Sequence, residues 1–101
     1  MTTISVLSEI LQAFEAGKTI KTIIQFGTVN GHFIVESIEP KELGDQWIFQ
    51  GGNFSLSTGR YNFLRKEQND ENIRYFFSTK SETHPKKFIC FEIIDNHNNN
   101  E

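Results

Sequence analysis

The chain has 101 residues, of which 37% are hydrophobic and 13% aromatic, and its formal net charge is −3. This length corresponds to a single domain with its own core, and so small a charge excludes a potent mimic of DNA. The longest apolar runs have three or four residues and no basic segment precedes an apolar stretch, so we expect neither a membrane span nor a secretory signal.

The single cysteine, Cys90, lies in the apolar run from Phe88 to Phe91. It has no second cysteine with which to form an internal disulfide, which fits the reducing cytoplasm. We therefore expect a cytoplasmic protein in which Cys90 is a small buried hydrophobic residue and not a reactive thiol.

Residues 4–16 are predicted to form the one helix, because their apolar residues recur at helical spacing along one stripe. Thr2, Thr3 or Ser5 can cap its start, and Gly17 marks its end. The stripe consists of Ile4, Leu7, Ile10, Leu11 and Phe14.

From Thr19 onward the apolar period changes to two, which predicts strands. Gly27 and Asn30-Gly31 both offer a turn, and Asn30-Gly31 is the stronger hairpin signal. Gly51-Gly52 predicts a bend or bulge, and the polar segments 42–45 and 80–87 are expected to be loops. The connections are too short for crossover helices, so the sheet should be antiparallel. The predicted strands are 19–26, 32–39, 46–50, 53–57, 60–66, 73–79 and 88–94.

Nine of the ten phenylalanines fall in predicted strands, and neighbouring positions such as Phe76-Phe77 and Ile93-Ile94 are both apolar. Neighbours in a strand point to opposite faces, so both faces of the sheet carry apolar residues. One helix of about thirteen residues covers roughly half of one face. The apolar surface that the helix leaves uncovered must be buried in a closed barrel, against a second copy of the chain or against a partner protein.

The predicted fold is therefore α+β, with one N-terminal helix packed on a strongly bent antiparallel sheet of five or six strands. A partly closed small barrel is an alternative arrangement of the same sheet. Residues 1–95 form the single domain. The Asn-rich tail 96–101 is expected to be frayed.

No catalytic or metal-binding pattern is visible. His32, His84 and His97 are scattered, whereas zinc sites need closely spaced Cys and His ligands. Gly51-Gly52 lacks the following helix of a phosphate-binding loop. We therefore expect no enzyme activity, no metal and no cofactor.

The order of a helix, a strand, the segment 27–31 and then Phe33 to Glu39 resembles the first motif of Sm-like RNA-binding domains. In that family a short helix precedes a bent five-stranded barrel, and a glycine-containing second strand ends near an acidic residue. The likeness covers about 25 residues of 101, and the family's second motif, with its Arg-Gly pair, has no clear counterpart. The resemblance implies a small bent barrel and, as an alternative function, RNA binding.

Elimination and the surplus of aromatic residues favour a non-enzymatic protein-binding module. Its most concrete form is a small inhibitor of the immunity or anti-defence type that occludes a partner's site, a size and layout common among phage and mobile-element proteins. Aromatic anchors dominate such interfaces, and basic residues rim them. The candidate contact residues are Trp47, Phe49, Tyr61, Arg65 and Arg74.

Two alternatives use the same residues differently. Residues 60–77 alternate basic and aromatic side chains, as proteins that bind single-stranded nucleic acid do. The competing interpretation places Tyr61, Phe63, Tyr75 and Phe77 in the core, with the arginines outward. The other alternative is a homodimer that binds a small molecule.

Overall fold

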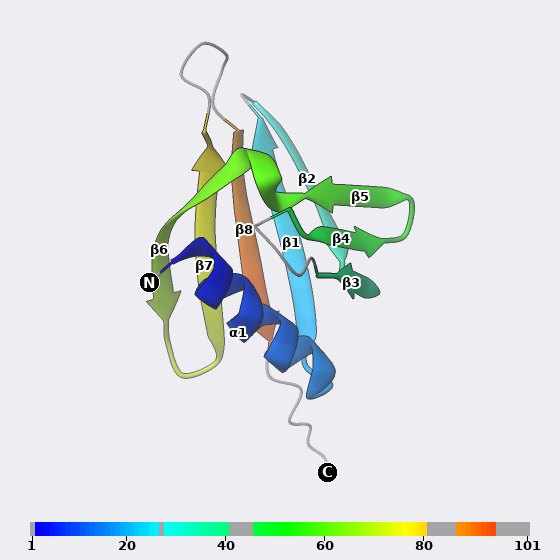
Figure 1. Ribbon diagram of the computed structural model, residues 1–101, viewed down its shortest axis with the longest axis vertical. Coiled ribbons are helices and arrows are strands. Elements are labelled where there is room, and N and C mark those ends of the chain that lie inside the picture. The colour runs from blue at the N-terminus through cyan, green and yellow to red at the C-terminus, as the bar shows by residue number, and fades with distance from the viewer. Residues whose placement is uncertain (1, 27, 41–45, 81–86, 95–101) are drawn as a thin grey trace.

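The computed structural model describes residues 2–26, 28–40, 46–80 and 87–94. They form one helix, a five-stranded sheet and a three-stranded sheet (Figure 1). The elements are α1 (Thr3–Glu15), β1 (Thr19–Phe26), β2 (Val29–Ile34), β3 (Ser37–Glu39), β4 (Ile48–Gly51), β5 (Phe54–Ser57), the 3-10 turn η1 (Thr58–Arg60), β6 (Tyr61–Gln68), β7 (Asn72–Thr79) and β8 (Lys87–Ile94).

Helix α1 begins and ends as its sequence predicts. The Thr2 hydroxyl accepts a hydrogen bond from the Ser5 backbone N–H at 3.1 Å, and the Ser5 hydroxyl binds the Thr2 backbone in return. Gly17 follows the helix with φ +90°, a conformation that favours glycine. The buried face differs from the predicted stripe, because Val6 lies in the core while Ile4, in the first turn, is exposed. In the part of the chain that the structure describes, no helix is long and apolar enough to cross a membrane.

The larger sheet has the strand order β2-β1-β8-β7-β6, and every neighbouring pair is antiparallel, as predicted. The hairpin predicted at Asn30-Gly31 is wrong. Both residues lie within β2, opposite Gln25 and Ile24, and the pairing of β1 with β2 already includes Phe26 and Val29. Residue 27, the loops 41–45 and 81–86 and the tail 95–101, for which a loop or fraying was expected, lie outside the described residues.

The sequence prediction of one strongly bent sheet needs correction, because the described strands form two separate sheets and no closed barrel. The chain leaves the larger sheet at Val35 and Glu36, where the Glu36 N–H donates to the Gln50 carbonyl at 2.7 Å, and continues as β3 beside β4. Gly51, predicted as a bend or bulge, ends β4 at the tight β4–β5 turn. The layout implied by the Sm-like resemblance is therefore not formed.

Helix α1 and the three-stranded sheet together cover one face of the larger sheet (Figure 1). Phe49 of β4 packs on Phe91 of β8 with ring centroids 4.5 Å apart, and Phe91 meets Phe77 edge to face. Thr58 fixes the return from the small sheet, because its buried hydroxyl accepts a hydrogen bond from the Trp47 N–H at 3.0 Å. The helix therefore covers part of this face and the small sheet the remainder.

Candidate functional site

The other face of the five-stranded sheet lies opposite both covering elements. Strand alternation sends Ile20 and Thr22 into the core and Ile23 to the opposite side. We call this second side the open face. Its described residues include Lys21, Ile23, Gln25, Asn30, His32, Ile34, Arg65, Glu67, Arg74, Phe76, Phe88, Cys90 and Glu92.

The centre of the open face is apolar and slightly hollowed. Phe88 is 44% exposed, and at the β2 edge Ile34 is 48% exposed. A cavity of about 220 Å³ lies over the three central strands. It is lined by Ile23, Gln25, Arg74, Phe76, Phe88, Ile89 and Cys90.

Paired charges border this hollow. Arg74 Nε lies 2.8 Å from Glu92 Oε2, which also accepts a hydrogen bond from Asn72 Nδ2 at 2.9 Å. Glu92 is almost buried, and the arginine compensates its charge. Arg65 pairs with Glu67 at 3.0 Å, and its guanidinium carbon lies 4.1 Å from the centroid of the Phe76 ring. The rim is thus fixed in place and nearly neutral.

Cys90 is buried, as predicted, and faces this hollow. Burial raises the pKa of its thiol to about 11, so the protonated form dominates at neutral pH. The side chain therefore contributes apolar surface and no nucleophile.

The structure separates the five residues that the sequence predicts for partner contact. Trp47, Phe49 and Tyr61 are buried in the core, whereas Arg65 and Arg74 lie side by side on the open face. The structure also confirms the interpretation that placed Tyr61, Tyr75 and Phe77 inward with the arginines outward.

Sequence reasoning did not select the half-buried ring of Phe76 or the exposed ring of Phe88. A signal for Phe76 was present, since assigning Tyr75 and Phe77 to the core sends the residue between them outward. Phe88 carries no such signal, because it begins a strand in which neighbouring positions are apolar.

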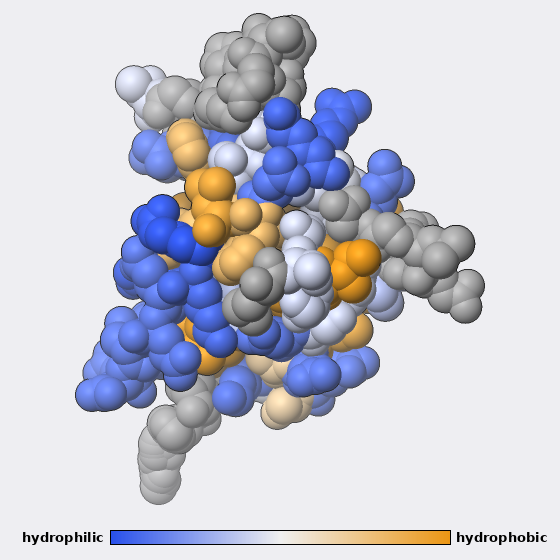
Figure 2. All heavy atoms as spheres, turned by 60° about the vertical axis from the view of Figure 1, so that its left-hand side comes forward, coloured by the Kyte–Doolittle hydropathy of each residue, from blue (hydrophilic) through white to orange (hydrophobic). Residues whose placement is uncertain are grey.

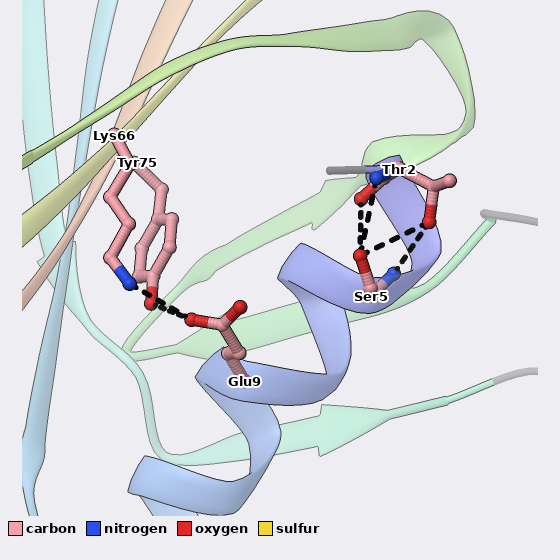
Figure 3. A network of polar contacts seen from close by, with 5 residues as sticks. All are labelled: Thr2, Ser5, Glu9, Lys66 and Tyr75. Carbon is pink, nitrogen blue, oxygen red and sulfur yellow. Dashed lines mark hydrogen bonds and ion pairs between the residues drawn. The ribbon is translucent and has the colours of Figure 1, made fainter.

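A second polar cluster joins the helix to the covered face (Figure 3). Tyr75 donates a hydrogen bond from its hydroxyl to Glu9 Oε1 at 2.6 Å, and Lys66 Nζ lies 3.2 Å from the same oxygen. Burial, together with the hydrogen bond to Glu9, raises the pKa of Tyr75, while that hydrogen bond lowers the pKa of Glu9. Both groups keep their ordinary charge near neutral pH, and the cluster attaches α1 to the sheet.

Among the described residues, no three His, Cys, Asp or Glu side chains lie close enough together to hold a metal ion. The comparisons with known proteins add no relationship: no protein-family model, no curated protein and no solved structure matches this chain.

Proposed function

We propose that this chain is a non-enzymatic protein-binding module whose contact surface is the open face of the five-stranded sheet. One observation carries the proposal: α1 and the small sheet bury one face, while Phe88 and Phe76 lie on the opposite face with no described element over them. Apolar residues gathered at the centre of a surface and rimmed by polar side chains are typical of protein interfaces. An inhibitor that occludes a partner's site is the most concrete form of this function.

The shape and charge of the open face favour a protein partner over the alternatives. The hollow of about 220 Å³ is smaller than the roughly 300–1,000 Å³ of pockets that enclose small ligands. Single-stranded nucleic acid needs free cations and free ring faces, but Arg65 and Arg74 are paired with carboxylates. Arg65 also occupies one side of the Phe76 ring.

The test is affinity capture from the native host with the wild type and two variants. Phe88→Glu places a charge on β8, the central strand of the open face, whereas Ile4→Glu changes an apolar residue of similar exposure on α1. Ile4 is 48% exposed and Phe88 is 44% exposed. We expect the captured partner, once purified, to bind Ile4→Glu as tightly as the wild type and to lose at least about tenfold in affinity with Phe88→Glu.

Equal binding of both variants would contradict the open face as the contact surface. Capture that disappears after nuclease treatment, and that weakens steeply with salt, would instead support nucleic-acid binding. Sedimentation of the wild type would reveal a homodimer directly.

A further inference from the structure

Among the described residues, only part of the outer edge of the segment from Val29 to Glu39 is paired with another strand. The segment from Val29 to Glu39 runs from the larger sheet into the smaller one, and β4 pairs with its far half. The near half, β2, pairs with β1 on one side, and no described strand pairs with it on the other.

Hydrogen-bond alternation shows which backbone groups point outward. The Val35 N–H donates to the Ile20 carbonyl at 2.9 Å, so these opposed residues form a hydrogen-bonded pair. Such pairs alternate along an antiparallel ladder, so the N–H and C=O groups of Asn30, His32 and Ile34 point away from β1.

Of the described strands, β4 approaches these outward groups, at the Ile34 end of β2. A Cβ added at Gly51 would stand 1.9 Å from the Ile34 carbonyl oxygen, so β4 approaches the edge closely there. Upstream, the outward groups of Asn30 and His32 continue the line along which β4 pairs. These outward N–H and C=O groups have the spacing needed for hydrogen bonds with a further extended strand.

The two edges of the larger sheet differ in how they are protected. β6 has an irregularity between Phe63 and Arg65 and carries several charges, and the side of the molecule in Figure 2 shows hydrophilic residues around a smaller hydrophobic patch. Bulges and charges are the usual means of preventing further strand pairing. From Thr28 to Val35 the β2 edge has no residue with a permanent charge, and it is regular in its pairing with β1.

The surroundings of this edge suit one strand rather than a second whole domain. The β4–β5 hairpin extends past β2 (Figure 1), and Phe54, 54% exposed, stacks on Phe33 with centroids 5.8 Å apart. A Cβ added at Gly31 would meet no atom within 4 Å, so the face of β2 is open at this position.

We propose that the outer edge of β2 binds an extended, uncharged segment of a partner protein as an added antiparallel strand. Its backbone pairs with Asn30 and His32, and an apolar side chain packs on Phe54. The uncharged edge offers no counter-ion, so an uncharged segment fits it best. The inference specifies a mode of protein binding, but it uses a surface separate from the Phe88 region.

The test compares two substitutions at one position. His32→Pro removes the outward N–H without removing a hydrogen bond to β1, and proline is tolerated in edge strands. His32→Ala removes the imidazole but keeps that N–H. The probe is a displayed library of random ten-residue peptides, selected on the wild type and then measured as free peptides.

We expect enriched peptides to be uncharged, to bind His32→Ala and Phe88→Glu like the wild type, and to bind His32→Pro at least about tenfold more weakly. The same peptides with alternate backbone nitrogens methylated should lose binding to the wild type, a readout that does not depend on how the proline variant folds. No enrichment, or binding that survives methylation, would overturn the proposal. Self-association of the wild type abolished by His32→Pro would assign the edge to a second copy and overturn it too. Loss of binding in Phe88→Glu would move the contact to the open face.

Discussion

At the scale of single residues, two glycines in strands have opposite reasons to be there. Gly51 lies where β4 meets the end of β2, so closely that any side chain would overlap the Ile34 backbone. Gly31, in the middle of β2, has open space where its side chain would stand and no positive φ. Glycine is therefore required at the first position and not at the second.

We predict that Gly51→Ala lowers the free energy of unfolding by about 1–3 kcal/mol, because the new methyl group must displace backbone atoms. Gly31→Ala should leave it unchanged or raise it by up to about 1 kcal/mol, since alanine restricts the unfolded chain. Urea unfolding followed by circular dichroism measures both. Equal effects of the two substitutions would mean that β4 and β2 do not meet as described.

At the scale of elements, α1 is held to the sheet by apolar packing and by the Glu9–Tyr75–Lys66 cluster. The cluster brings together residues far apart in the chain, one on the helix and two on neighbouring strands. Because the hydrogen bond from Tyr75 lowers the pKa of Glu9 below its usual 4.5, the ionised carboxylate is favoured in the folded state. Its contribution to stability is thus present above the pKa of the unfolded chain and is lost as pH falls through the folded value.

We predict that Tyr75→Phe reduces the free energy of unfolding by about 1 kcal/mol near pH 7, and that this difference narrows as the pH falls below 4.5. Denaturant unfolding at a series of pH values measures the narrowing. The wild type, unfolded over the same series of pH values, is the reference for this difference. If the difference in unfolding free energy between the wild type and Tyr75→Phe stays constant down to pH 3, the cluster contributes no pH-dependent stability.

The elements themselves could be predicted from the sequence, because they depend on local patterns. The capping residues Thr2 and Ser5, the Gly17 stop and the period-two strands all act through neighbours in the chain. The prediction at Asn30-Gly31 was wrong because Phe26 already pairs with Val29, which places Asn30 and Gly31 inside a strand. Where two turn signals compete, pairing across the whole hairpin decides between them.

At the scale of the whole molecule, the strand order and the separation into two sheets could not be predicted. β8, the last strand, lies between β1 and β7, a pairing of segments about 70 residues apart that no local pattern specifies. Local patterns also do not show which strands pack on one another, so Trp47 and Phe49 were predicted to lie in a binding surface. Aromatic residues look alike in sequence whether they anchor a partner or, as here, join one sheet to another.

The neighbouring rings Phe76 and Phe77 test whether the molecule has one buried and one open face. Phe77 is fully buried against Phe91 and Phe63, so Phe77→Ala should lower the free energy of unfolding by about 3–5 kcal/mol. Phe76 lies on the open face with Arg65 over its ring, so Phe76→Ala should lower it by roughly 1 kcal/mol. Urea unfolding at low and high protein concentration measures both. If both substitutions cause similarly large losses in the free energy of unfolding, and if these losses grow on dilution, a second copy covers the open face in solution. A small effect of Phe76→Ala that does not depend on protein concentration would leave that face available to another protein.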